Sequence, residues 1–248
     1  GRLLEMQGNS FAAERIYARL TKISPRFIYG WSNLGNTQVI LGKLDSADEA
    51  YTNSINLCVS DPDTGGKLLG AKPCDDLYIL YLNRGSLRLN NGQYAAALSD
   101  LELADQYRGK LDATILQNRA RARELTSDYK GADRDYTLSI QMAGSNPKEI
   151  APFWLRGALV KFQLGESIEA LDLVRRVEGR FPEAPEVRAA LAVLLWKRGD
   201  EDGARRKFLE IPDLARRKFL DEEYLRVTIA WPPKCLGVLR EIQTAVGD

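Results

Sequence analysis

A pattern of aromatic, small and apolar residues recurs along this chain and restricts its fold more than any other feature. The first complete copy consists of Trp31, Leu34, Gly35, Gly42, Ala47 and Tyr51. Altered copies occupy residues 81–101, 116–136, 154–174 and 191–208, and residues 8–25 form the second half of a further copy. The distance from Ala13 to Ala47, and again from Ala170 to Ala204, is 34 residues. Self-similarity at a fixed period of this length indicates a repeat protein.

Each copy predicts a hairpin of two helices. In the fourth copy, apolar residues at helical spacing lie on both sides of Gly165, namely at Trp154, Ala158, Phe162, Ala170, Leu171, Val174 and Val177. Small residues stand where the two helices of a hairpin must approach closely, at Gly35, Gly85, Ala120, Ala158 and Ala192. Because one hairpin cannot bury its apolar face alone, we expect neighbouring hairpins to stack on one another.

The positions of the repeats predict where the hairpins start. Full hairpins are expected to begin near Ile28, Leu77, Ala113, Ala151 and Pro185. A first helix is expected to be cut at Gly1, so that the natural chain would begin further upstream. No β-sheet is expected.

These residues and their spacing resemble the tetratricopeptide repeat (TPR) family, and the resemblance covers residues 2–212. It implies an all-α, right-handed superhelical solenoid whose first helices line a groove that binds a peptide, a helix or another subunit. We expect residues 1–212 to form the solenoid, with half a repeat, five full repeats and an inserted loop at 58–76. Residues 213–248 are expected to form C-terminal capping helices.

The groove is the expected binding site. In a TPR hairpin its residues lie on the first helix, opposite the face that carries the Trp/Gly pattern, which selects Asn33, Asn36, Asn83, Asn118, Arg121, Arg156, Leu159, Phe162 and Trp196. The asparagines suit an extended backbone, and the arginines beside apolar residues suit an acidic residue next to an apolar anchor. As an exposed charge, Arg156 is expected to contribute little to stability. Packing against a neighbouring helix or the tail stays open for the apolar members.

The predicted inserted loop at 58–76 is bracketed by Cys58 and Cys74. The loop is either a docking element or a tolerated surface insertion, because added loop length costs little free energy. A disulfide between the two cysteines would indicate an oxidising compartment and would leave Cys235 unpaired. Three cysteines are also ordinary for a reduced protein, and the sequence does not decide between these cases.

The tail departs from the repeats. Residues 204–209 recur letter for letter as residues 215–220, and the second copy is expected to begin a capping helix. Trp231, Pro232 and Pro233 should end it, because paired prolines cannot continue a helix. A last amphipathic segment follows with Leu236, Val238, Leu239, Ile242 and Val246. This tail either caps the core or docks a partner through Trp231 or the final helix.

Several classes of function are disfavoured. The chain has no histidine and no phosphate-binding, nucleophile or dinucleotide motif, so we expect neither catalysis nor a cofactor or metal. Its net charge of +1 disfavours nucleic-acid binding, since the basic runs at 205–207 and 216–218 are flanked by acidic residues. No apolar run approaches the length of a transmembrane segment.

The sequence therefore predicts a non-catalytic scaffold or assembly factor that binds a protein or peptide partner. The alternative is a permanent structural subunit of a large multiprotein complex. The sequence at Asn83, Arg84 and Gly85 is similar to that of repeats in TPR proteins of cyanobacteria and plastids. That similarity implies a role in a photosynthetic or other organellar complex, which can be membrane-associated. The location it favours is the chloroplast, in the stroma or the thylakoid lumen, with the cytoplasm as the second choice.

Overall fold

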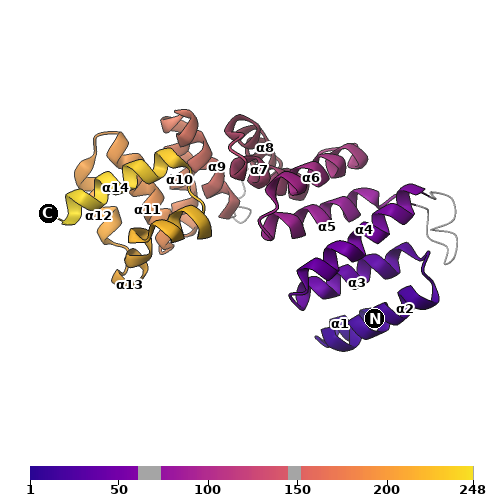
Figure 1. Ribbon diagram of the computed structural model, residues 1–248. Helices are drawn as coiled ribbons and strands as arrows, with labels where there is room; N and C mark the ends of the chain where they lie inside the picture. The colour runs from indigo at the N-terminus through magenta and orange to yellow at the C-terminus, as the bar shows by residue number, and fades with distance from the viewer. Residues whose placement is uncertain (61–73, 145–151, 248) are drawn as a thin grey trace. The chain divides into compact units, whose positions relative to one another are not determined.

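Helices and the turns between them make up the described part of the chain (Figure 1). The computed structural model describes residues 1–60, 74–144 and 152–247. No strand occurs among these residues, which confirms the predicted all-α class.

Most helices are separated by only a few residues along the chain. In the first half they are α1 (Arg2–Met6), α2 (Ser10–Ile23), α3 (Ile28–Ile40), α4 (Leu44–Ser60), α5 (Leu77–Asn90), α6 (Tyr94–Arg108) and α7 (Ala113–Leu125). The second half has α8 (Tyr129–Ala143), α9 (Pro152–Leu164), α10 (Ser167–Arg180), α11 (Pro185–Lys197), α12 (Glu201–Leu209), α13 (Asp213–Arg216), the 3-10 helix η3 (Arg217–Leu220), the π-helical turn η4 (Tyr224–Thr228) and α14 (Pro233–Gly247).

Consecutive helices pack as the repeat pattern predicts. Helices begin at Ile28, Leu77, Ala113 and Pro185, which are the predicted starts of the first, second, third and fifth full hairpins. The fourth full hairpin begins with α9 at Pro152. Its predicted start, residue 151, lies outside the described residues. The pairs α3 with α4, α5 with α6, α9 with α10 and α11 with α12 are in contact.

The turns inside the hairpins require a left-handed backbone. Gly42, Gly92, Gly165 and Gly199 occupy these turns with φ between +72° and +97°. Glycine adopts this conformation without the steric cost that a Cβ would bring. In the third hairpin, Ser127 takes the same place with φ of +66°. The repeat therefore loses its usual turn residue at one position.

The chain forms two compact units, residues 1–122 and 123–248, here called the N-terminal unit and the C-terminal unit. In the N-terminal unit, α2 packs on α3 and α4 packs on α5. In the C-terminal unit, α8 packs on α9 and α10 packs on α11, while α14 from the tail contacts α9, α11 and α12.

Arginine–aspartate pairs hold the N-terminal unit together. Asp100 on α6 is only 2% exposed and accepts hydrogen bonds from Arg84 at 2.7 Å and Arg88 at 3.0 Å, both on α5. Arg88 also pairs with Asp48 on α4 at 2.6 Å, and this hydrogen bond raises the pKa of the guanidinium. Charge-assisted bonds of this kind satisfy a buried carboxylate and fix the spacing of three helices.

One large apolar cluster forms the core of the C-terminal unit. It joins Trp154 and Phe162 of α9 to Phe208 of α12, all of which are buried. The tail contributes to the same cluster with Phe219 and Leu239. The tail is therefore part of the core of this unit.

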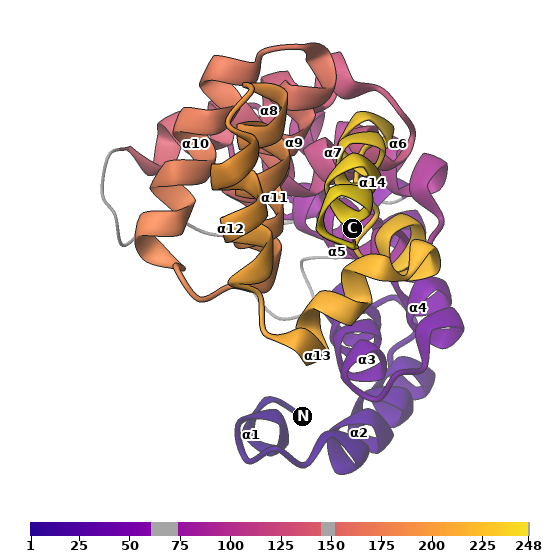
Figure 2. The same ribbon diagram turned by 90° about the vertical axis from the view of Figure 1, so that its left-hand side faces the viewer.

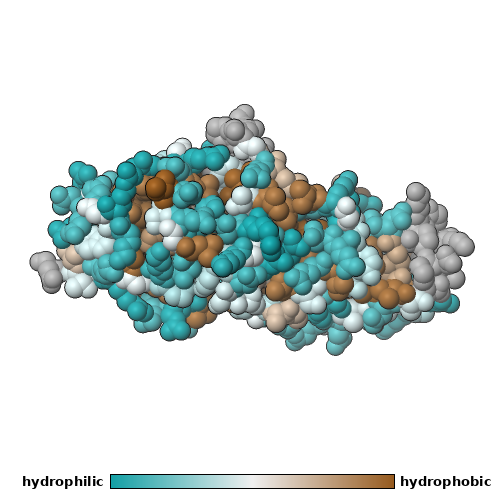
Figure 3. Space-filling view, turned by 90° about the horizontal axis from the view of Figure 1, so that it is seen from above, coloured by the Kyte–Doolittle hydropathy of each residue, from teal (hydrophilic) through white to brown (hydrophobic). Residues whose placement is uncertain are grey.

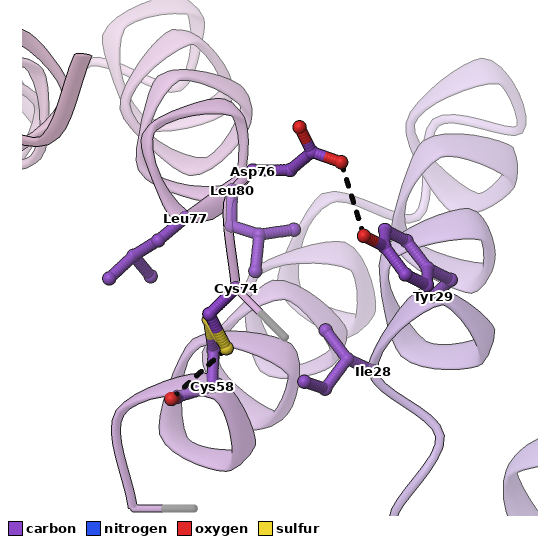
Figure 4. A pocket seen from close by; sticks show the side chains of 7 residues that line it. All are labelled: Ile28, Tyr29, Cys58, Cys74, Asp76, Leu77 and Leu80. Carbon is purple, nitrogen blue, oxygen red and sulfur yellow. Dashed lines mark hydrogen bonds between the residues drawn. A yellow bond between two sulfur atoms is a disulfide. The ribbon is translucent and has the colours of Figure 1, made fainter. Parts of the chain in front are cut away.

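A disulfide joins Cys58 at the end of α4 to Cys74 just before α5, with the two Cα atoms 5.5 Å apart (Figure 4). Beside it, the Tyr29 hydroxyl donates to the Asp76 carboxylate at 3.1 Å. Burial, together with Asp76, raises the pKa of Tyr29. The pocket between these residues measures about 10 Å³, room for a single water molecule. The bridge thus ties the segments on either side of the predicted loop, of which residues 61–73 lie outside the described part.

Replacing Cys58 and Cys74 together with serine should lower the free energy of unfolding of the N-terminal unit by about 3 kcal/mol, the entropic effect of closing a loop of this length. Urea unfolding monitored by circular dichroism measures the change. Peptide mapping by mass spectrometry without reductant should recover a Cys58–Cys74 pair and a free Cys235. A disulfide between Cys235 and either of the others would contradict this structure.

Candidate functional site

The first helices of the hairpins carry the predicted binding residues, and the structure places them in two different settings. In the C-terminal unit, α14 packs against α9 and α11, the first helices of the fourth and fifth hairpins (Figures 1 and 2). In the N-terminal unit, the corresponding helices α3 and α5 contact each other. The two groups of predicted residues therefore differ in what packs against them.

Leu159 and Phe162 of α9 lie beneath the tail, and both are completely buried. The Cys235 thiol of α14 is 3.8 Å from the Leu159 carbonyl oxygen, and the Lys234 ammonium lies 4.6 Å from the centre of the Phe162 ring. Neither residue offers a surface to a partner in this structure. They pack against the tail instead, the alternative that the sequence left open for the apolar residues.

Arg156 is the best-connected residue of the predicted set. Its side chain is 13% exposed and forms an ion pair with Glu124, whose own side chain is 2% exposed. The guanidinium also donates to the carbonyl oxygens of Ile229 at 2.9 Å and Ala230 at 2.6 Å. Burial lowers the pKa of Arg156, but the neighbouring Glu124 outweighs this effect and the pKa is raised.

The expectation that Arg156 is an exposed charge of little importance for stability is therefore corrected. Glu124 accepts a further hydrogen bond from the Tyr136 hydroxyl at 3.0 Å. The arginine thus joins α7, α9 and the backbone of the tail in one buried polar network. The physical reason for the correction is that the tail returns over α9 and removes Arg156 from solvent.

Trp196 and Trp231 both form hydrogen bonds within the C-terminal unit. The half-buried Trp196 donates from its indole nitrogen to Glu241 of α14 at 2.9 Å. Trp231 is 3% exposed and donates to Glu186 of α11 at 3.0 Å. Trp231 therefore anchors the tail to the repeats, which is the capping arrangement rather than an exposed docking residue.

The predicted asparagines of the N-terminal unit remain at its surface. Asn33 and Asn36 of α3 and Asn83 of α5 are all partly exposed, and we call them the asparagine face. The Asn83 amide donates to the Asn36 side-chain oxygen at 3.4 Å, and the Tyr51 hydroxyl donates to the same oxygen at 2.6 Å. Burial raises the pKa of Tyr51, so its hydroxyl keeps its proton and stays a donor.

Asn118 and Arg121 of α7 are also partly exposed. The Asn118 amide donates to the Thr114 carbonyl oxygen of its own helix at 2.9 Å. Five of the six polar residues of the predicted set are thus located in the N-terminal unit, and Asn36 and Asn83 are brought into direct contact.

A cleft in the C-terminal unit combines tail residues, among them Trp231 and Leu236, with residues of the third hairpin that were not predicted as binding residues. It has a volume of about 330 Å³ and is bordered by the end of α7, the turn into α8, and the tail around Arg226 and Pro232. Ser127 and Ala230, both with positive φ, line it. The missing turn glycine at position 127 was the one available sequence signal. The tail contributes to the cleft by packing against residues about one hundred positions earlier in the chain. Such a long-range contact leaves no local pattern in the sequence.

Other site types find no support in the described residues. None of the helices described is long and apolar enough to cross a membrane. No group of three or more cysteine, aspartate or glutamate side chains in this part of the chain is arranged to hold a metal ion. The face shown in Figure 3 is mixed, with small hydrophobic groups separated by hydrophilic side chains.

Comparison with solved structures identifies the fold. The TPR protein YrrB, which has an unusual peptide-binding site, matches with a TM-score of 0.61 at 12% identity, covering 78% of this chain and 89% of YrrB. PilW, a type IV pilus biogenesis factor, matches with a TM-score of 0.62 at 13% identity, covering 96% of this chain and 94% of PilW. BtubC from P. vanneervenii matches with a TM-score of 0.61 at 16% identity, covering 86% of this chain and 90% of BtubC.

No family model matches the sequence, and a search of curated proteins finds no match either. The structural similarity shows that the chain has the TPR fold, which confirms the predicted fold class. At these identities it carries no information on the partner.

Replacing Arg156 with alanine should destabilise the C-terminal unit by about 3 to 5 kcal/mol, because it leaves the buried Glu124 carboxylate without its cation. Urea unfolding measures the effect. The exposed Arg175 on α10 is the matched control, and its alanine variant should stay within about 0.5 kcal/mol of the wild type. Equal stability of the two variants would contradict the structural role of Arg156.

The Cys235 thiol should report whether α14 is seated. It is completely buried, and burial raises its pKa from the ordinary 9.0 to about 12. Because the raised pKa belongs to the folded state, the contribution of this thiol to stability is present below pH 9 and is lost as the pH rises towards 12. Iodoacetamide at pH 8.5 should therefore leave Cys235 unmodified until urea unfolds the C-terminal unit. Rapid modification without urea would show that α14 is not held on α9 and α11.

Proposed function

We propose that the protein is a non-catalytic scaffold that binds an extended segment of a partner protein on the asparagine face of its N-terminal unit. The observation that carries this proposal is the contact between Asn36 and Asn83, which lie on consecutive first helices and are both partly exposed. In the C-terminal unit, the tail covers the corresponding helices, so the predicted apolar residues Leu159 and Phe162 are not accessible.

The chemistry of the asparagine face suits peptide backbone. The Asn36 oxygen already accepts two hydrogen bonds, so Asn36 offers its amide group as a donor and Asn83 offers its side-chain oxygen as an acceptor. A peptide in extended conformation presents the complementary groups at regular spacing. Tyr51 holds the Asn36 side chain in place through its hydroxyl. Such a preorganised amide loses little freedom on binding. The peptide-binding site of YrrB, a protein with the same fold, supports this assignment by analogy only.

The finer proposal is that the scaffold assists the assembly of a multiprotein complex. The assignment to a photosynthetic or other organellar complex rests on the similarity of the repeat sequences to those of plastid and cyanobacterial TPR proteins. The Cys58–Cys74 bond favours an oxidising compartment, which among the chloroplast compartments supports the thylakoid lumen rather than the stroma.

A permanent structural subunit is the second candidate, favoured by the same repeat architecture. The two candidates differ in stoichiometry and lifetime. An assembly factor should be recovered with partially assembled complexes in substoichiometric amounts, and a structural subunit should be recovered in a fixed ratio with one complete complex. Quantitative mass spectrometry of the purified assemblies distinguishes them.

Replacing Asn83 with alanine should weaken peptide binding about two- to ten-fold, the effect of one net hydrogen bond. The measurement uses a display library of extended peptides selected on the full chain, with affinities determined by fluorescence anisotropy. Asn83 is a cleaner test than Asn36, because removing Asn36 also removes the hydrogen-bond acceptor of Tyr51.

The exposed Asn53 on α4 provides the control, and its alanine variant should bind like the wild type. If the Asn83 variant keeps full affinity for every selected peptide, the asparagine face is not the binding surface.

A further inference from the structure

The cleft of the C-terminal unit forms where the repeat pattern is broken. Four hairpin turns use a glycine in the left-handed conformation, and the third uses Ser127. A serine in this conformation costs free energy that a glycine would not. The side chain is exposed and borders the cleft of about 330 Å³. At this turn the chain thus carries a hydroxyl that the fold itself does not require.

The opposite side of the cleft is also built from unusual backbone. Ala230 has a φ of +46°, and its carbonyl oxygen accepts a hydrogen bond from Arg156. The π-helical turn η4 precedes it and carries Arg226. Non-glycine residues with positive φ and π-helical turns occur frequently at functional sites. Both sides of one cleft therefore contain conformations that the surrounding structure has to maintain.

The charges around the cleft leave a positive group at its edge. Glu124 lies at the cleft but is compensated by its ion pair with Arg156. Arg226 lines the cleft with a side chain that is 66% exposed. Its partner Glu222 is 3.6 Å away and lies closer, at 2.6 Å, to Arg240. Exposed pairs of this kind exchange easily, so Arg226 is available to an incoming anion.

The remaining lining is divided between hydroxyl groups and apolar surface. Ser127 and Tyr129 contribute hydroxyls, while Leu125, Pro232 and Leu236 contribute apolar side chains. The hydroxyls and the Arg226 guanidinium can all donate hydrogen bonds to a carboxylate. The apolar side chains can cover one bulky side chain of a ligand.

We propose that this cleft binds a partner protein segment in which an aspartate or glutamate stands next to a bulky apolar residue. The carboxylate pairs with Arg226 and the Ser127 hydroxyl, and the apolar side chain packs against Leu125, Pro232 and Leu236. This site is distinct from the asparagine face, which lies in the other unit and recognises backbone rather than charge.

The test uses an array of 12-residue peptides, acetylated and amidated at their ends, with a central Glu-Phe, Glu-Leu, Asp-Phe or Asp-Leu pair in varied flanks. A matched array replaces each acid by its amide. The full chain should bind members of the first array and lose at least ten-fold in affinity for their amide partners. Peptides that carry a free C-terminal carboxylate but no internal aspartate or glutamate should bind no better than the peptides of the matched amide array.

Two variants then locate the site. Arg226→Ala should reduce the affinity of the selected acidic peptides about ten-fold or more, the effect of a charge-assisted hydrogen bond. Ser127→Gly should raise the melting temperature by removing the left-handed serine, and should weaken the same peptides by about two- to ten-fold. A gain in stability together with a loss in binding cannot come from misfolding.

Arg217→Ala is the matched control, because Arg217 is an exposed tail arginine outside the cleft lining. It should bind like the wild type. Binding that does not depend on the acid, or wild-type affinity in both cleft variants, would overturn the proposal. So would a loss of affinity seen only with Asn83→Ala, which would assign the peptides to the asparagine face.

Discussion

The buried guanidinium of Arg156 is the interaction on which the C-terminal unit depends. It neutralises Glu124 at the end of α7 and holds two successive carbonyl oxygens of the tail, at Ile229 and Ala230. A planar group with five donors can make these contacts at once, whereas a lysine could not. The tail is thereby fixed at the point where it turns into α14. Seating of α14, burial of Leu159 and Phe162, and the shape of the adjacent cleft all follow from this anchor.

The two units are stabilised by different interactions, and this difference explains which of the first helices remain accessible. In the N-terminal unit, Asp100 and its arginines link successive helices. Asp135 with Arg123 repeats the pair in the third hairpin, at the start of the C-terminal unit. At the matching place in the fourth hairpin the chain has Leu173, which belongs to the large apolar core. A core rich in apolar residues needs a cover at its end, and the tail supplies it. The more polar first helices of the N-terminal unit do not need one and keep their asparagines accessible.

The fold was largely predictable because its determinants are local. Helix periodicity, small residues at close contacts and turn glycines gave the hairpin starts at Ile28, Leu77, Ala113 and Pro185 without knowledge of distant contacts. The site was predictable only in part. Helical geometry selected residues of the first helices, but no local signal shows that residues near 230 return to Arg156, because these contacts span 73 and 74 positions. The repeated segment 215–220 was expected to begin one capping helix. It instead contributes to the short helices α13 and η3, and Phe219 is buried in the core.

The central claim is that the tail is an integral part of the C-terminal unit and occupies the helices that a partner would otherwise contact. Native-state hydrogen exchange measured by mass spectrometry tests it most directly, because it reports the opening free energy of each helix separately. The account predicts that the amides of α14 and α9 are protected to the same degree and lose protection together when denaturant is added. Fast exchange in α14 while α9 stays protected would show that the tail is only loosely attached, and would contradict it.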